Sequence, residues 1–319
     1  MGKSLKKQRY LIRVPGTSAN LGPGFDIMGL AVNVYNQFFF EFSDKSAYKT
    51  QLVDGRPVPF EPSDDLVWES YKRYFSIFLP NQEPLPYDLS MDLNLPLKGG
   101  LGSSASAVVA GFSAARLAHK KFYKSDKLPD ENLFLYELAE VEGHADNTIP
   151  AYMGGLVLAY FIERKRLHFF KKKLPTNVSI FIFIPNIEIE TSASRRTLPV
   201  SYSTKDVIYN MARVATWFEF LGTKRFSHLR LAVKDKLHTP YRITKHPVLP
   251  KLSEFIEKLG GCYSLSGSGP SLLLYCKKSE EEKFHKEVEL FLNEHISSEL
   301  LYSFKKLKVD NKGTIIKKL

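Results

Sequence analysis

Two hydrophobic patterns along the chain predict a mixture of helices and strands. Apolar residues recur at helical spacing between residues 64 and 78, and they alternate with polar residues between 87 and 95. These are the periods of an amphipathic helix and of a half-buried strand. By the same criteria, further strands are predicted over residues 9–14, 35–42, 156–162, 178–184 and 272–276, and further helices over 104–120, 132–143, 204–221, 252–259 and 280–292. Both halves mix the two element types without regular alternation, which predicts an α+β fold.

The chain is long enough for two domains. It has 319 residues, and 44% of them are hydrophobic, which is enough to form substantial cores. Composition changes over residues 163–173, where charged side chains dominate. We therefore expect an amino-terminal domain over residues 1–165 and a carboxy-terminal domain over residues 166–319.

A loop rich in glycine and serine joins the predicted strand at 87–95 to the predicted helix at 104–120. Its Gly-Leu-Gly turn lets the backbone approach a ligand closely, because glycine has no Cβ. A helix that begins near Ser104 directs its free N–H groups and the positive end of its dipole at the loop. The loop therefore predicts an anion site, and phosphate is the expected anion.

A dinucleotide-binding turn and a simple tight turn both fit this loop less well. Gly100 to Ala105 matches the loose G-x-G-x-x-A pattern of dinucleotide-binding folds. That fold needs an uninterrupted strand before the loop and an acidic residue about 20 positions after it. Pro96 interrupts the approach, and the acidic candidate, Asp126, lies in a polar turn. A simple tight turn accounts for the glycines, but not for the hydroxyls of Ser103, Ser104 and Ser106.

Charge and cysteine content narrow the class of protein. The net charge is +11, but the basic residues are scattered in small groups. We expect a solvated surface whose field attracts anionic substrates, and no nucleic-acid partner. No apolar run reaches the roughly 18 residues that a membrane span needs, so no membrane partner is expected. The two cysteines form no C-x-x-C motif, and the amino terminus lacks a secretory pattern, so a cytoplasmic location is expected.

Pro96 to Ala105 resembles the phosphate loop of the GHMP kinase superfamily. Five further segments are similar to motifs of the homoserine kinase family within that superfamily; they span residues 15–26, 142–147, 191–199, 238–242 and 266–271. The resemblance implies two α+β domains with the active site between them. The first would be like the second domain of ribosomal protein S5, and the second would be ferredoxin-like.

The resemblance implies an ATP-dependent, magnesium-dependent phosphotransferase. Magnesium prefers oxygen ligands, and the resemblance assigns them to Ser103 and Glu142, with Glu140 as the neighbouring alternative. The ATP-binding residues would be those of the phosphate loop: Pro96, Leu97, Lys98, Gly99, Gly100, Leu101, Gly102, Ser103, Ser104, Ala105 and Ser106. Asp65 stands near a position where relatives often have an adenine-contacting Asn, which leaves recognition of the base there in doubt.

The implied substrate is L-homoserine, which carries a carboxylate, an ammonium group and a reactive hydroxyl. Forked guanidinium groups suit the carboxylate, and the resemblance supplies Arg195 and Arg242. Asp26 is the candidate for the ammonium group, and closure of the domains is expected to bring these three together. The remaining substrate contacts expected from the resemblance are Asn20, His144, Asn147, Thr191 and Gly267.

The expected catalytic residues are Ser103, Glu142 and Asn147. Phosphoryl transfer depends mainly on positioning and charge neutralisation, so no general base is required, and His144 is expected to be a structural donor. Two alternatives stay open at this point: another GHMP kinase of the mevalonate type, and a kinase-like binding protein without turnover. The resemblance also leaves a homodimer open.

Overall fold

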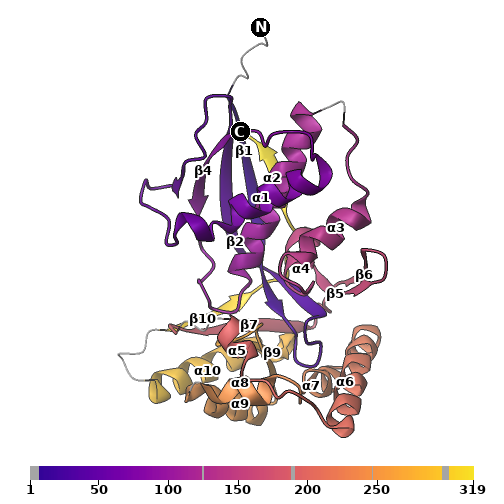
Figure 1. The fold of residues 1–319 in the computed structure, drawn as a ribbon. Helices are drawn as coiled ribbons and strands as arrows, with labels where there is room; N and C mark the ends of the chain where they lie inside the picture. Colours follow the sequence, from indigo (N-terminus) through magenta and orange to yellow (C-terminus); the bar gives the residue numbers. More distant parts are fainter. Residues whose placement is uncertain (1–6, 124–125, 188–190, 246, 297–301) are drawn as a thin grey trace.

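The computed structural model describes residues 7–123, 126–187, 191–245, 247–296 and 302–319. Within these ranges the strands form two sheets, one in each half of the molecule (Figure 1). The first sheet has the order β11-β1-β2-β4-β3, with β5 paired to β2 and β6 paired to β5. The second has the order β10-β7-β9-β8. Helices accompany both sheets, which confirms the predicted α+β class.

The first sheet contains β1 (Gln8–Ala19), β2 (Met28–Phe42), β3 (Thr50–Leu52), β4 (Tyr87–Asp92), β5 (Leu156–Ile162), β6 (Arg166–Lys172) and β11 (Ile315–Lys318). The helices of this half are α1 (Leu66–Phe78), α2 (Ser103–Phe122), α3 (Glu131–Glu140) and α4 (Thr148–Met153), with a 3₁₀ turn at Pro62–Asp64. A buried core fills the space between this sheet and its helices; it includes Phe38, Phe40, Tyr71, Phe112 and Phe134.

The second sheet contains β7 (Val178–Pro185), β8 (Cys262–Leu265), β9 (Leu272–Lys277) and β10 (Tyr302–Leu307). The helices of this half are α5 (Thr191–Arg195), α6 (Thr204–Thr223), α7 (Phe226–Ala232), α8 (Thr239–Arg242), α9 (Val248–Lys258) and α10 (Glu281–His295), with 3₁₀ turns at Ile243–Lys245 and Lys278–Glu280. One face of the sheet packs on α9 and α10 through a core that includes Phe183, Leu252 and Leu292. None of the described helices is both long and apolar enough to cross a membrane.

A further core cluster joins the two halves. It combines Leu30 and Leu101 of the first half with Ile182, Trp217 and Leu273 of the second. Burial of side chains of this size contributes roughly 1.5–3 kcal/mol each. The two halves therefore meet through a packed apolar interface, and the loops at its edge are held in fixed positions.

The first predicted turn is shorter than expected. The sequence predicts a long turn from Pro15 to Asp26, but β1 continues to Ala19 and β2 begins at Met28. A bulge between Pro15 and Gly16 shifts the register by two positions and lets the strand continue past the proline. The true turn is therefore confined to the residues between the two strands.

Several further elements were not predicted, because their sequences are either polar or very short. The charged segment after residue 163 forms β6, the free edge of the β5–β6 hairpin, in which Leu167 is buried and its neighbours are exposed. Charged side chains are common on edge strands. The polar turns at 144–155 and 235–242 contain the short helices α4 and α8. The division at residue 165 remains a prediction; β6 and β11 both lie beyond it and pair within the first sheet.

Candidate active site

A cavity of about 900 Å³ lies where the two halves meet. The residues that line it come from segments far apart in the chain, and the predicted site residues among them are Asn20, Asp26, Pro96, Leu97, Lys98, Gly99, Gly100, Gly102, Ser103, Ser104, Glu142, His144, Asn147, Arg195, Arg242 and Gly267. The cavity therefore joins the glycine-rich loop to the charged residues of the second half. Leu101, Ala105 and Ser106 are fully buried and do not line it.

The glycine-rich loop leads into the amino terminus of α2 as predicted. Gly102 caps the helix in a left-handed conformation (φ 66°), and a Cβ there would lie 2.2 Å from the Thr17 hydroxyl. The helix has 20 residues, and its first free N–H groups and positive dipole end lie beside Ser103 and Ser104, which line the cavity. This end of the cavity suits an anion.

Serines of the second half hold the loop in place. The Ser266 hydroxyl donates to the Gly100 carbonyl and the Ser271 hydroxyl donates to the Gly99 carbonyl, both at 2.6 Å. Both serines are fully buried. The segment at residues 266–271, one of those similar to a family motif, therefore holds the loop in place from the second half.

We expect Ser271→Ala to loosen the loop, because it leaves a buried carbonyl without a donor. The expected loss is about 1–3 kcal/mol in the free energy of unfolding, together with weaker ATP binding. Ser253→Ala is the matched control, since its hydroxyl donates to the Pro250 carbonyl of α9. Urea unfolding and nucleotide titration measure both effects. Unchanged ATP affinity in Ser271→Ala would contradict the supporting role.

Glu142 carries a carboxylate oxygen without a partner in the described part of the chain. Its Oε1 accepts a hydrogen bond of 2.7 Å from the Ser104 hydroxyl, while Oε2 is buried and unpaired. Burial raises the pKa of Glu142, whereas His144 and Ser104 oppose this shift. An unpaired carboxylate oxygen beside a hydroxyl and a helix amino terminus fits a hard cation such as Mg²⁺. Glu140, the alternative, is exposed at the end of α3 and is not among the cavity residues.

Asp26 and Arg195 form a two-pronged ion pair across the two halves. Both Nη atoms of Arg195 donate to the Asp26 carboxylate at 2.9 Å. This hydrogen bond raises the pKa of Arg195. The two residues meet in this structure, as expected, while the part played by domain closure remains a prediction.

Arg242 lies close to this pair but is almost fully buried, with 4% of its surface exposed. Its Nη1 donates to the Gly267 carbonyl at 3.3 Å, and its buried Nε has no partner among the described residues. Burial and the charge of Arg195 lower the pKa of Arg242. A buried guanidinium with an unused donor fits a carboxylate ligand.

Phe25 was not predicted, yet it organises both arginines. The guanidinium carbons of Arg195 and Arg242 each lie 5.3 Å from the centre of its ring, and the ring stacks on His238. Burial lowers the pKa of His238, and its Nε2 lies 2.8 Å from the Gly22 carbonyl. A neutral ring that donates to this carbonyl leaves Nδ1 to face Arg242, at 3.5 Å.

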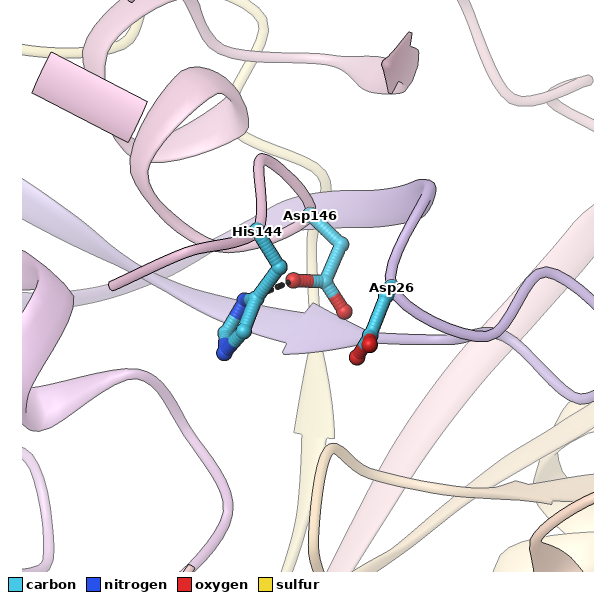
Figure 2. Close-up of side chains that lie close together, drawn as sticks. All are labelled: Asp26, His144 and Asp146. Atoms are coloured by element: carbon cyan, nitrogen blue, oxygen red, sulfur yellow. Dashed lines mark hydrogen bonds and ion pairs between the residues drawn. The ribbon is translucent and has the colours of Figure 1, made fainter. Parts of the chain in front are cut away.

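His144, Asp146 and Asp26 all line the cavity, and their side chains lie close together, as Figure 2 shows. His144 Nδ1 lies 2.6 Å from Asp146 Oδ1, and ligand atoms of the three residues all lie within 4.8 Å of one another. Burial alone would lower the pKa of His144, but Asp146, Glu142 and Asp26 together raise it to about 9. With a protonated imidazole on Asp146 and with Arg195 on Asp26, this cluster suits the ammonium group of a substrate better than a divalent metal ion.

We expect NMR to show His144 titrating with a pKa of about 9. In Asp146→Asn the apparent pKa of His144 should fall, because the hydrogen bond and the charge that raise it are lost. The folded-state pKa lies above the unfolded value of about 6.5. The stabilisation from the pair should therefore be complete below about pH 6.5 and be lost as pH rises through about 9. A wild-type titration at about pH 6–7, the ordinary range, would contradict the assigned pair.

Asn147 and Asn20 are held by internal hydrogen bonds. Thr17 donates its hydroxyl to Asn147 Oδ1 at 2.8 Å, which fixes the orientation of that amide. Asn20 Nδ2 donates to the Gly267 carbonyl, and Asn20 Oδ1 accepts from the Asp26 N–H, both at 2.9 Å. Asn20 and Gly267 therefore line the cavity but also fix the loop. Thr191 begins α5, and its side chain lies outside the described residues.

The far end of the cavity is apolar and was missed in the sequence. It is lined by Val58, Pro59, Phe60, Leu66, Met91 and Leu93. The proline-rich run around Val58 fits no binding motif. Its hydrophobicity was the only feature of its sequence that indicated a place in the lining of the cavity. Asp65 also lines this end, but its carboxylate accepts from the Val67 and Trp68 N–H groups and so caps α1. The flat ring system of a nucleotide's base fits this apolar end of the cavity.

Comparison with known proteins gives consistent matches. The family model for the GHMP kinases N terminal domain matches residues 65–155. The homoserine kinase of Clostridium botulinum (strain Kyoto / Type A2) is 33% identical over 308 residues, which cover 96% of this chain and 97% of that protein. The homoserine kinase of Clostridium beijerinckii is 33% identical over 310 residues, with the same coverage.

Solved structures share the fold. Homoserine kinase from Cytophaga hutchinsonii superposes with a TM-score of 0.81 at 23% identity, covering 99% of both chains. Mevalonate diphosphate decarboxylase from Enterococcus faecalis gives a TM-score of 0.67 at 14% identity, covering 98% of this chain and 100% of that one. The two-domain architecture expected from the motifs is therefore confirmed.

Proposed function

Because this chain belongs to the homoserine kinase family of the GHMP kinases, we propose that it transfers the γ-phosphoryl group of ATP to the side-chain hydroxyl of L-homoserine. The products are ADP and O-phospho-L-homoserine, and the reaction leads into threonine synthesis. The observation that supports this substrate is the group of opposite charges at one end of the cavity. A zwitterionic amino acid needs both a cation and an anion there, and Arg242 and Asp26 supply them.

The substrate's two charges fit different residues. Arg242 is buried and has an unused donor, so it is suited to the carboxylate. Asp26 is paired with Arg195 in the free protein, and its carboxylate also faces the His144 side of the cavity. Insertion of an amino acid would exchange one internal ion pair for two new ones, with the ammonium on Asp26 and the carboxylate shared with Arg195.

The reactive hydroxyl would then lie near the glycine-rich loop. Homoserine separates its hydroxyl from the charged carbon by two methylene groups, so the hydroxyl extends away from Arg242. Asn147 and His144 line the path between the two ends of the cavity. Asn147 is held by Thr17, so its amide Nδ2 remains oriented to donate a hydrogen bond.

The phosphate groups would lie against the amino terminus of α2, where backbone N–H groups can stabilise the charge that moves during transfer. Glu142, with Ser103 and Ser104 beside it, would hold Mg²⁺. When bound, this ion would neutralise charge on the phosphate groups. His144 is not suited to be a strong general base, because Asp146, Glu142 and Asp26 outweigh its burial and keep it protonated at neutral pH, with a pKa of about 9. We therefore assign two contributions to the chain: it positions the reacting groups, and it stabilises the charge that moves during transfer.

The test is a phosphotransfer assay with homoserine, mevalonate and shikimate, followed by ³¹P NMR of the product. We expect phosphorylation of homoserine and negligible turnover of the other two. A mevalonate-type kinase would phosphorylate mevalonate, because an acid without an ammonium group needs an arginine but not Asp26. Nucleotide and homoserine binding without any product would indicate the catalytically inactive alternative.

A further inference from the structure

His238 is fully buried next to Arg242, and its ring is held from two sides. Its Nε2 lies 2.8 Å from the Gly22 carbonyl and 3.4 Å from the Asp235 carboxylate. The ring of Phe25 stacks on the imidazole, with ring centres 5.3 Å apart and 25° between the planes. Since the side chains of His238 and Asp235 are 0% and 1% exposed, no solvent competes for these contacts. The orientation of the imidazole is therefore fixed.

Asp235 forms a rigid base for this arrangement. One of its oxygens accepts from the Asn210 amide at 2.7 Å and from the Leu237 N–H at 2.8 Å. The other accepts from the backbone N–H groups of His238 and Thr239, at 3.0 and 2.6 Å. The carboxylate thus fixes the backbone at the start of α8, the helix that ends at Arg242.

The contacts of the imidazole place its hydrogen on Nε2. Both neighbours of Nε2, the Gly22 carbonyl and the Asp235 carboxylate, accept hydrogen bonds, so Nε2 is the donor. In a neutral ring Nδ1 then carries a lone pair. Nδ1 lies 3.5 Å from Nη1 of Arg242, which only donates. A protonated ring would direct a second N–H at the guanidinium, so this geometry favours the neutral ring with Nδ1 as an acceptor.

The guanidinium of Arg242 is held at one of its three nitrogens. Nη1 donates to the Gly267 carbonyl at 3.3 Å and faces Nδ1 of His238. The guanidinium carbon lies over the Phe25 ring, 5.3 Å from its centre. Nε is buried and has no partner among the described residues. A guanidinium held at Nη1 leaves the edge formed by Nε and Nη2 for a ligand, and this edge can fork onto a carboxylate.

We propose that His238 is a positioning residue for substrate recognition: its Nδ1 holds Nη1 of Arg242, so that the Nε–Nη2 edge of the guanidinium takes the substrate carboxylate. This inference rests on the proposed function, because the carboxylate is that of homoserine. His238 is not among the residues that line the cavity, so it acts on the substrate only through Arg242. Loss of its acceptor leaves the arginine present and charged, but free to turn.

A purely structural role is the alternative, because the Nε2 hydrogen bond of His238 also ties the Gly22 loop to the second half. Two substitutions separate the roles by removing one ring nitrogen at a time. The side-chain amide of glutamine reaches as far from Cβ as Nε2 does, so His238→Gln can keep the bond to Gly22 but loses the acceptor for Arg242. The amide of asparagine reaches only as far as Nδ1, so His238→Asn keeps an acceptor for Arg242 and loses the bond to Gly22.

The first experiment measures homoserine KM, homoserine binding by calorimetry and ATP affinity in both variants. His238→Gln should weaken homoserine binding about tenfold or more, the loss expected for a hydrogen bond to a charged group, with ATP affinity and kcat nearly unchanged. His238→Asn should keep KM near the wild-type value but unfold at a lower urea concentration. His285→Gln, at an exposed histidine of α10, is the control and should match wild type. The reverse order, in which Asn raises KM and Gln does not, would overturn the positioning role.

The second experiment uses 3-aminopropanol, which is homoserine without its carboxylate. His238→Gln should lower kcat/KM for homoserine and leave the slow turnover of 3-aminopropanol as in wild type. In an Arg242→Ala background, His238→Gln should cause little further loss, because both changes remove the same contact. Equal losses for the two substrates, or additive losses in the double variant, would overturn the inference.

The wild-type result separates this inference from the function on which it rests. If wild-type protein does not phosphorylate homoserine, the proposed function fails, and the positioning role fails with it. If it does, and His238→Gln leaves homoserine KM unchanged, only the role of His238 is refuted.

Discussion

Arg242→Ala is expected to raise the homoserine KM by roughly 10²- to 10³-fold while ATP affinity, measured separately, stays within about twofold. Removing one member of a desolvated charge pair costs about 3–5 kcal/mol, and each 1.4 kcal/mol is about tenfold in affinity. Arg242 is almost completely buried, so little solvent is present to replace it. Its unused Nε donor shows that the internal contacts do not saturate it.

The controls separate a binding role from a folding role. Arg242→Lys keeps the charge but loses the fork, so it should recover only part of the affinity. Arg196→Ala alters an exposed arginine next to Arg195 and should leave KM unchanged. Arg195→Ala should have a smaller effect than Arg242→Ala, because 46% of the Arg195 side chain is exposed and solvent screens its charge. Equal KM values for wild type and Arg242→Ala would refute the carboxylate assignment.

Glu142→Gln should lower kcat by roughly 10²- to 10³-fold, a loss of the size seen when one preorganised electrostatic contact is removed. Homoserine binding should change little, because Glu142 lies at the glycine-rich loop rather than beside Arg242. The amide keeps the size of the side chain but loses the negative charge that would hold the cation. Glu140→Gln, near the end of the same predicted helix, is the control and should behave like wild type.

A binding measurement gives an independent result. Mn²⁺ titration in the presence of a non-hydrolysable ATP analogue should show weaker metal affinity in Glu142→Gln than in wild type or Glu140→Gln. Ser104→Ala removes the hydroxyl that orients Glu142 and should give an intermediate loss. If metal affinity and kcat are unchanged in Glu142→Gln, the carboxylate has no part in metal binding.

The parts of the site that the sequence predicts well are local ones. The glycine-rich loop and the start of α2 follow from backbone rules that apply within a few residues, and Gly102 takes the left-handed conformation that such a loop needs. Arg195, Arg242 and Asp26 were chosen by the charges of the substrate that the resemblance implies. The structure brings all three to one cavity, but their roles in binding remain proposals.

Long-range pairings could not be predicted from the sequence. The loop that carries Asp26 is held from the second half: Trp217 donates to the Leu21 carbonyl and Asn210 to the Pro23 carbonyl. No pattern within one segment reveals such contacts, because each depends on packing between residues 196 and 187 positions apart, respectively. The same limit accounts for the failure to predict the Asp26–Arg195 ion pair, the role of Phe25 and the Ser104–Glu142 contact.

Strand assignment failed where burial and sequence pattern disagree. β1 continues through Pro15 and Gly16 because its last residues are buried against the rest of the sheet, although the residues themselves are typical of turns. β11 pairs with β1 from the opposite end of the chain. Tertiary context decides such cases, and a single sequence does not report it.

The measurement that tests the account most directly compares homoserine with 4-hydroxybutyrate, which lacks only the ammonium group. If Asp26 recognises that group, wild-type kcat/KM should favour homoserine by roughly 10³-fold or more, since a site built for a polar group rejects the analogue that lacks it. Asp26→Asn should lose most activity toward homoserine and little toward 4-hydroxybutyrate, so the preference should collapse. Wild-type protein that phosphorylates 4-hydroxybutyrate or mevalonate as efficiently as homoserine would contradict an amino-acid substrate.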